Sequence, residues 1–325
     1  MAVDGKKRQM PPGLMKIKEL NKENLKTCGL QLICHVTQEF KKEQNKLRTY
    51  VTEILHSIFF LAIIHKDRLT PEDILSAQTE IVRQEFPEPF RNYKSHLPKR
   101  TPFSILLDIM QLTFGTKENI MKELCSLMKK LKFPYPLHKP ANKNQRYYTL
   151  ESTVICVCSN SLNTSQEYFG ASLGCRTENA KSIMIYSSCI NTWHEYVSYA
   201  VMSFEHQTEG DSLQFHESMQ CQAYIRDWKD NIYKERQPCM NCTRLFSLPK
   251  GTEQEHYPYG NCAETECLSK LLFNDQFMLE NIKIRNYTTD KMNMLKHRTR
   301  ERLLGKLASI PSLSNLNKDD LWFNT

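Results

Sequence analysis

Three cysteines and one glutamate in the C-terminal half of the chain have types and spacing that suit metal chemistry. Cys239 and Cys242 form a Cys-x-x-Cys pair, and 19 residues separate Cys242 from Cys262. Two thiolates with two residues between them can reach one zinc ion from a tight turn or a helix start. Three cysteine ligands would leave a coordination position open, as in catalytic zinc sites. Glu264 would lie in the same first helical turn as Cys262, where its carboxylate could transfer protons.

A closed structural site is an alternative. Cys267 follows Cys262 by five residues, so the four cysteines have the spacing Cys-x2-Cys-x19-Cys-x4-Cys. This spacing is close to that of structural four-cysteine zinc sites, in which every coordination position is filled. His256 lies between the two motifs and could replace one of the ligands. A third alternative is that the thiols bind no metal, and the sequence leaves these alternatives open.

Other candidate ligands are weaker. We assign Cys156 and Cys158 to opposite faces of one strand, and therefore to core packing rather than to a shared metal ion. His194 and Glu195 resemble the start of a helical metalloprotease motif, but Ser198 stands where the second histidine is required. We therefore interpret His194 as an ordinary helix residue.

The composition is that of a folded chain. Of the 325 residues, 40% are hydrophobic, which is sufficient for a substantial core, and the length favours two domains over one. The first residues show no apolar signal-peptide segment, and the longest apolar run, 58–64, is too short to cross a bilayer. Twelve cysteines without a secretory signal favour metal or redox chemistry over disulfides. We expect an intracellular protein, cytoplasmic or nuclear, without a membrane partner.

The charge is unevenly distributed. Residues 1–150 carry 26 Lys and Arg against 15 Asp and Glu, whereas residues 151–280 carry 9 against 17. The short segment 281–306 is basic again, with 8 against 2. A nucleic acid would bind the two basic segments if it bound at all, and Lys-rich helices are often simply solvated. Nucleic acid as a partner therefore stays open, and the acidic region disfavours a long strand at the cysteine site.

The pattern of apolar residues changes once along the chain. Within residues 14–132, apolar residues recur at three- and four-residue steps, which predicts about five helices in a small bundle. A proline-rich stretch follows and predicts a linker. Beyond it we predict strands at 147–159 and 167–174 and leave 213–233 ambiguous between strand and helix. We also predict helices at 180–204, 262–273 and 288–307, a short strand at 282–284 and a loose tail at 311–325.

These elements predict a mixed α+β or α/β protein, with an N-terminal helical bundle followed by a smaller α/β domain. We place the helical domain at 1–135, the linker at 136–146, the α/β domain at 147–287, and a basic helix with a tail at 288–325. A bundle placed ahead of the cysteine-bearing domain would be the surface that a protein partner contacts.

The segment 259–264, Tyr-Gly-Asn-Cys-Ala-Glu, resembles the Cys-Ala-Glu helix of the cytidine deaminase-like superfamily, and most closely its divergent toxin-type branch. The segment 238–242, Pro-Cys-Met-Asn-Cys, similarly resembles the second zinc motif of that superfamily. The expected strand pair ahead of the Cys-Ala-Glu helix also suits this fold. The resemblance covers residues 147–272. The two motifs stand here in the reverse of the family's order.

The resemblance implies a deaminase-like zinc domain. Cys239, Cys242 and Cys262 would be the ligands, and Glu264 the catalytic proton carrier. The substrate would be the exocyclic amine of a nucleobase or nucleoside. The alternative function is a non-catalytic interaction protein, in which Cys267 completes a structural zinc site.

Overall fold

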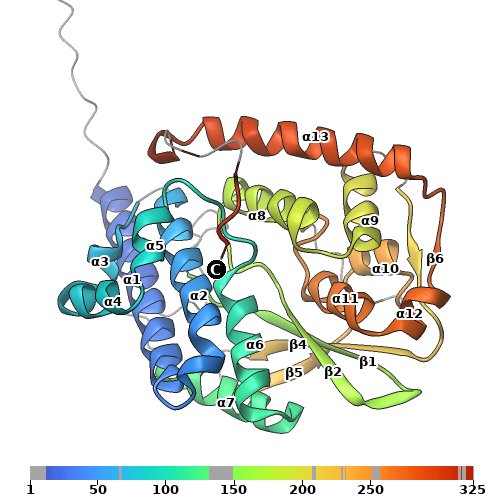
Figure 1. Ribbon diagram of the computed structural model, residues 1–325, viewed down its shortest axis with the longest axis horizontal. Helices are drawn as coiled ribbons and strands as arrows, with labels where there is room; N and C mark the ends of the chain where they lie inside the picture. The colour runs from blue at the N-terminus through green and yellow to red at the C-terminus, as the bar shows by residue number, and fades with distance from the viewer. Residues whose placement is uncertain are drawn as a thin grey trace, which may run out of the picture.

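The computed structural model describes residues 12–65, 68–131, 149–206, 210–227, 230, 232–249, 251, 257–313, 316 and 320–324. The protein is mixed α+β, with helices preceding a small antiparallel sheet (Figure 1). The mixed class predicted from the sequence is therefore confirmed. The linker predicted at 136–146 lies outside the described residues, and the domain boundaries stay predictions.

The described part of the first 131 residues is helical, as its periodicity predicts. Its elements are α1 (Pro12–Phe40), α2 (Gln44–Ile64), α3 (Pro71–Leu75), η1 (Ser76–Gln78), α4 (Thr79–Glu85), α5 (Pro87–Asn92), α6 (Pro102–Phe114) and α7 (Lys117–Lys130).

Local signals set several of these helix ends. Thr70 and Asp73 form a capping box at α3, because each side chain bonds the backbone N–H of the other at 3.2 and 2.8 Å. Thr116 caps α7 through the N–H of Asn119. Gly115 ends α6 with φ +73°, a left-handed conformation that favours glycine.

Helix α2 is the one described helix whose length and apolar composition would suffice to cross a membrane. In the fold it is a core helix, since 72% of its most apolar window is buried.

The C-terminal part alternates strands and helices. Its elements are β1 (Val154–Asn160), β2 (Asn163–Ala171), α8 (Glu178–Asn191), α9 (Glu195–His206), β3 (Leu213–Gln214), β4 (Met219–Asp227), β5 (Ile232–Arg236), α10 (Met240–Phe246), α11 (Ala263–Asn274), α12 (Gln276–Asn281), β6 (Lys283–Ile284), α13 (Thr289–Ala308) and η2 (Pro311–Leu313).

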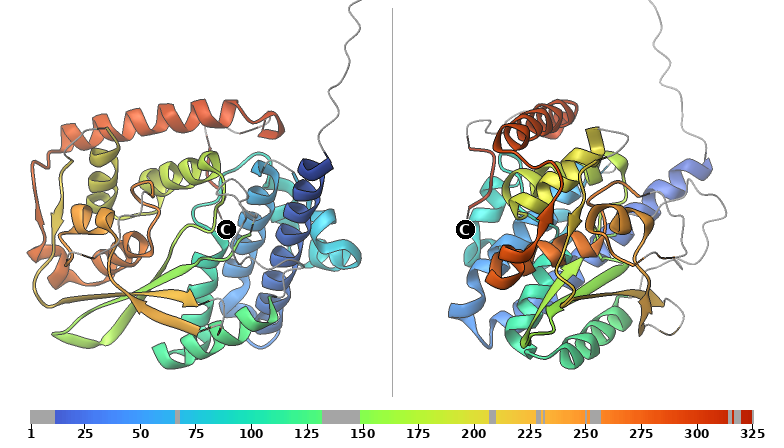
Figure 2. Two further views of the ribbon diagram at one scale, coloured as in Figure 1. Left: turned by 180° about the vertical axis from the view of Figure 1, so that it is seen from behind. Right: turned by 90° about the vertical axis from the view of Figure 1, so that its right-hand side faces the viewer.

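The main sheet is antiparallel, in the order β2-β1-β4-β5, and β3 pairs separately with β6. Helix α11 packs on β1 and β2, while α6 and α7 contact the edge strands β2 and β5 (Figures 1 and 2). On the face turned from α11, Tyr224 of β4 is buried, with Lys117 Nζ 5.3 Å from its ring. The sheet therefore lies between α11 and the helices of the first half.

Two predicted elements differ from the observed ones. The predicted helix 180–204 is two helices, α8 and α9, because the N–H groups of Thr192 and Trp193 both bond the carbonyl of Ser188 and end α8. The next N–H, that of His194, bonds Ser269 Oγ of α11 at 2.7 Å. The described part of the tail is not loose, since Leu321 and Phe323 are buried and bond the backbone of Leu97.

The helical part and the sheet share one contiguous core, which contains Leu25 of α1, Phe103 of α6 and Ile155 of β1. Helix α13 lies across α8 and α9 on the outside (Figure 1). The cysteine-bearing helices are thus positioned by elements from both halves of the chain.

Candidate metal centre

The Cys-x-x-Cys pair lies at the start of α10. Cys239 is the N-cap residue, with extended backbone angles, and its carbonyl accepts the N–H of Thr243 at 3.0 Å in the first helical turn. Cys242 lies within that turn, so both side chains face the same side. Their sulfur atoms are 3.6 Å apart. The two-residue spacing therefore predicts the local geometry correctly.

The third cysteine, Cys262, is the N-cap residue of α11. The turn before it requires Gly260, whose φ is +86° and whose missing side chain leaves room for Ile185, Val201 and Trp193. The carbonyl of Asn261 accepts the N–H of Leu173 at 3.0 Å and so ties this turn to the end of β2.

The three sulfur atoms form a cluster. Cys239 and Cys262 Sγ are 3.3 Å apart, and the sulfurs of Cys239, Cys242 and Cys262 all lie within 4.8 Å of one another. Ligands at about 2.3 Å from a tetrahedral zinc ion are separated by about 3.8 Å. The sulfur–sulfur distances of 3.3 and 3.6 Å are close to this value, and the cluster is compatible with a metal site. Among the described residues it is the one group of His, Cys, Asp or Glu side chains that meets this spacing.

The thiols of the cluster differ in acidity. Hydrogen bonds with Cys242 and Cys262 favour the thiolate of Cys239 and lower its pKa. The pKa of Cys242 is raised because its hydrogen bonds with Cys239 and Cys262 favour the protonated thiol, and that of Cys262 is raised chiefly by its hydrogen bond with Cys239. One negative charge is therefore stabilised in the cluster without a metal, and a bound cation would compensate further charges.

Glu264 lies in the first turn of α11 and is 3% exposed. Burial raises the pKa of its carboxyl group to about 7, and the charge of Cys239 acts in the same direction. A hydrogen bond with Cys242 and the charge of Arg236 oppose this shift. The carboxyl group is thus held beside the cysteine cluster in a largely dry environment.

A cavity of about 170 Å³ adjoins the cluster, and Cys239, Cys262 and Glu264 are among the residues that line it. Val154, Leu173 and Ile225 supply apolar walls. The arrangement gives a small ligand access to the cluster and to the carboxyl group together.

Cys267 does not join this cluster. Its sulfur lies 2.7 Å from Cys158 Sγ and donates to the carbonyl of Tyr168 at 3.0 Å, on the side of α11 that faces the sheet. The assignment of Cys156 and Cys158 to opposite faces was wrong, because residues two apart on a strand share a face. Both lie beneath α11, with Cys156 Sγ 3.4 Å from Cys221 Sγ.

The two histidine candidates have different outcomes. His256 lies outside the described residues. His194 precedes α9, where its Nδ1 accepts the N–H of Tyr196 at 3.3 Å and its ring packs edge-on against Phe273. This placement agrees with a structural role for His194.

Close packing fixes α11 over the sheet. A Cβ atom on Gly170 of β2 would lie 2.3 Å from the carbonyl oxygen of Ala263 and 2.5 Å from the nitrogen of Cys267. Real Cβ atoms do not approach other atoms so closely, so glycine is required at this crossing. The contact determines how far the N-terminus of α11 lies from the sheet, and hence the position of Cys262.

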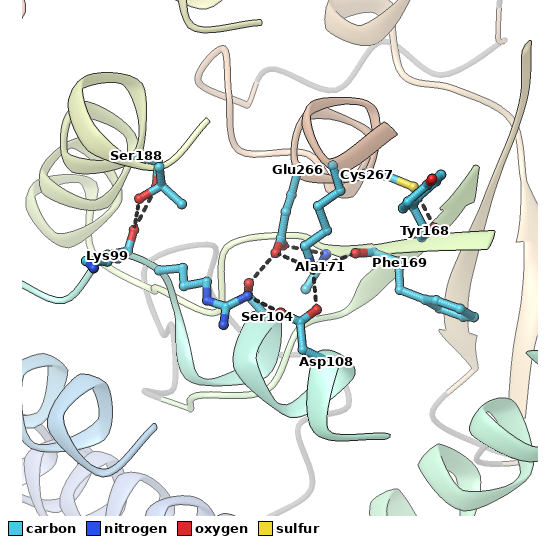
Figure 3. Close-up of polar contacts among 12 residues, drawn as sticks. Lys99, Ser104, Asp108, Tyr168, Phe169, Ala171, Ser188, Glu266 and Cys267 are labelled. Carbon is cyan, nitrogen blue, oxygen red and sulfur yellow. Dashed lines mark hydrogen bonds and ion pairs between the residues drawn. The ribbon is translucent and has the colours of Figure 1, made fainter. Parts of the chain in front are cut away.

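A network of charged side chains also holds this helix in place (Figure 3). Glu266 accepts the N–H of Ala171 at 2.9 Å and the hydroxyl of Ser104. Lys270, one turn later, contacts Asp108 of α6 at 2.6 Å and Glu266 at 3.0 Å. Helix α11 is therefore bonded both to β2 and to α6 of the N-terminal half.

Several residues of the cavity were not singled out by the sequence analysis. Arg176, Lys181, Arg236 and Asn261 all line it. Arg236 stands three residues before Cys239 and Asn261 one residue before Cys262, and this proximity could have indicated them. Arg176 and Lys181 come from the start of α8, and no local pattern connects them with the cysteines.

Comparison of this chain with protein-family models, with curated proteins and with solved structures finds no match.

Proposed function

We propose that this protein is a zinc-dependent hydrolase of the deaminase type, with Cys239, Cys242 and Cys262 as zinc ligands. The observation that carries the proposal is the shared cavity, which Glu264 lines together with Cys239 and Cys262. A carboxyl group beside a three-thiolate cluster, at the wall of a pocket, is the minimum set for metal-assisted hydrolysis.

Zinc is the metal that the ligand set favours. Thiolates are soft ligands and select zinc, copper(I) or iron–sulfur clusters over magnesium or calcium. Cys239, Cys242 and Cys262 would hold the zinc ion, which would supply a Lewis acid that makes water more reactive near neutral pH.

Glu264 would move the proton. Its carboxylate accepts a proton from the attacking water and passes it to the departing amine, so that water adds oxygen to the ring carbon and ammonia leaves. The substrate is an amino-substituted, amidine-like ring such as a nucleobase. The apolar walls of the cavity suit a planar ring.

The geometry supports this function over the closed structural site. Cys267, which would complete a four-cysteine site, contacts Cys158 instead. The inverted order of the two motifs is no obstacle to convergence, because Cys239 and Cys262 lie 3.3 Å apart despite it.

The test is metal stoichiometry combined with ammonia release. Purified protein is expected to bind one zinc ion, and Cys239→Ser, Cys242→Ser and Cys262→Ser each to lose most of it. Cys267→Ser is the matched control, since it removes a buried thiol from α11 outside the cluster, and it should keep the metal. Zinc lost in Cys267→Ser would instead support the closed structural site.

Glu264→Gln separates metal binding from chemistry. It should keep the zinc and abolish ammonia release from amino-substituted bases or nucleosides. Full zinc in the wild-type protein without deamination of a panel of such compounds would contradict the catalytic proposal and leave a metal-stapled domain.

A further inference from the structure

The cavity beside the cysteine cluster is basic at its walls. Arg176, Lys181 and Arg236 line it, and among the described lining residues Glu264 is the one acidic group. All three cations are half-buried. This concentration is unusual for the region, because residues 151–280 carry 9 Lys and Arg against 17 Asp and Glu. Three of the nine basic residues therefore line one small cavity.

Contacts position at least two of the three cations. The guanidinium of Arg176 donates to Thr149 Oγ1 at 3.0 and 3.1 Å and lies 3.6 Å from the buried carboxylate of Glu151. Lys181 Nζ lies 5.5 Å from the ring centroid of Tyr257, which also lines the cavity. Arg176 and Lys181 therefore have defined positions, as anion recognition requires.

Asn261 adds an unpaired polar atom. Its side chain is 7% exposed and lines the cavity immediately before Cys262. The Oδ1 atom is covered by protein and has no hydrogen-bond partner among the described residues. Buried acceptors are nearly always paired, and a rotation of the Asn261 side chain would present this acceptor to a donor of a ligand in the cavity.

We infer that the substrate of this site is a free nucleotide, with a phosphate group bound by Arg176, Lys181 and Arg236 and an N–H group of the base bound by Asn261. This inference rests on the proposed function, because it places the base at Glu264. The small volume, about 170 Å³, and the acidic surroundings favour a single nucleotide over a nucleic-acid strand.

The experiment measures binding rather than turnover. Zinc-loaded Glu264→Gln protein is titrated calorimetrically with matched pairs: cytidine and CMP, adenosine and AMP, guanosine and GMP. At least one monophosphate is expected to bind about tenfold or more tightly than its nucleoside, since charge-assisted hydrogen bonds to phosphate are among the stronger ones. Equal affinities within every pair would overturn the inference.

Two variants on the Glu264→Gln background locate the phosphate. Arg236→Gln and Lys181→Gln should each weaken the monophosphate several-fold and leave nucleoside binding unchanged. Lys234→Gln is the matched control, because it removes a positive charge from the same strand as Arg236. Lys234 pairs with Asp227, and neither residue lines the cavity. A phosphate preference that survives the Lys181→Gln, Arg236→Gln double variant would place the phosphate elsewhere and overturn the inference.

Two further measurements, oligonucleotide binding and ammonia release, separate the nucleotide site from other ligands and from the proposed function. A single-stranded oligonucleotide that binds more tightly than every monophosphate, and loses this advantage in Arg236→Gln, would overturn the assignment to a free nucleotide. Ammonia release by wild-type protein tests the function independently. Monophosphate binding that depends on Arg236 without ammonia release would sustain the nucleotide site and refute the deaminase. Ammonia released equally from nucleosides and monophosphates would support the deaminase and refute the nucleotide site.

Discussion

Cys239 and Cys262 are the N-cap residues of two different helices, 23 residues apart in sequence, and their sulfur atoms lie 3.3 Å apart. The two helices therefore meet through their N-termini. Besides the Cys242 and Cys262 thiols, the backbone N–H groups of Asn241 and Cys242 at the start of α10 lower the pKa of Cys239 and so favour the thiolate, which is the form that binds a metal.

Removal of the metal is expected to lower the thermal stability. A ligand that binds the folded state alone stabilises it by about 2.7 kcal/mol at one hundred times its dissociation constant. A thiol-compatible chelator should therefore lower the melting temperature of the wild-type protein by several degrees, measured by scanning calorimetry. The Cys262→Ser variant should show a melting temperature that the chelator does not change. An identical chelator effect in both proteins would contradict metal binding at this cluster.

Gly170→Ala should destabilise the protein and weaken metal binding, although residue 170 is not a ligand. The added Cβ would clash with backbone atoms of Ala263 and Cys267, which cannot rotate away. We expect a loss of about 2–4 kcal/mol in the free energy of unfolding, measured with urea. Zinc affinity should fall in parallel, because α11 must shift.

Gly305→Ala is the matched control for this substitution. Gly305 lies in α13 with open space around its Cα, so alanine there should leave zinc affinity unchanged. It should raise stability by about 0.5–1 kcal/mol through helix propensity. Equal effects of the two substitutions would show that the crossing at Gly170 does not position the site.

Lys270→Met should be destabilising. Lys270 lies half-buried between Asp108 and Glu266, and without it Glu266 loses this cation while Asp108 keeps Arg100 as its partner. Loss of one partner of a partly buried ion pair costs about 1–3 kcal/mol, since the remaining carboxylate loses a compensating contact. Chemical denaturation measures the change. Lys234→Met, which breaks an exposed pair with Asp227, should give little change.

Acid should destabilise the fold through two buried histidines. Burial lowers the pKa of His56 to about 3 and that of His65 to about 4. In the unfolded chain both titrate near 6.5, so below this pH the unfolded state binds protons that the folded state does not. The stability that these two histidines contribute is therefore complete above pH 6.5 and is lost progressively towards pH 3–4, by about 2 kcal/mol for each histidine at pH 5.

His56→Phe tests the acid dependence directly. The His56 ring is stacked on Phe323 with centroids 3.9 Å apart, and phenylalanine can keep this contact without accepting a proton. The variant should reduce the loss of stability between pH 7 and pH 5 by about 2 kcal/mol, measured in urea. His297→Gln, at an exposed position on α13, should retain the full difference.

Much of the secondary structure followed from local patterns. The capping box at Thr70, the N-cap at Thr116 and the glycine after α6 each begin or end a helix through contacts within a few residues, so the helical periodicity of 14–132 could be read locally. The position of β4 did not follow, because its register depends on hydrogen bonds to β1, about 65 residues earlier. The division between α8 and α9 likewise involves Ser269, 75 residues away from His194.

The sequence by itself determined that Cys239 and Cys242 face one point, because a two-residue spacing at a helix start permits little else. It also determined that Cys262 begins a helix. Only the tertiary structure decided which later cysteine meets the pair. Cys262 and Cys267 lie five residues apart on α11 and therefore point in different directions, one past the helix N-terminus and one into the sheet. The crossing at Gly170 and the charges around Lys270 fix that orientation, and no spacing along the chain encodes contacts between elements so distant in sequence.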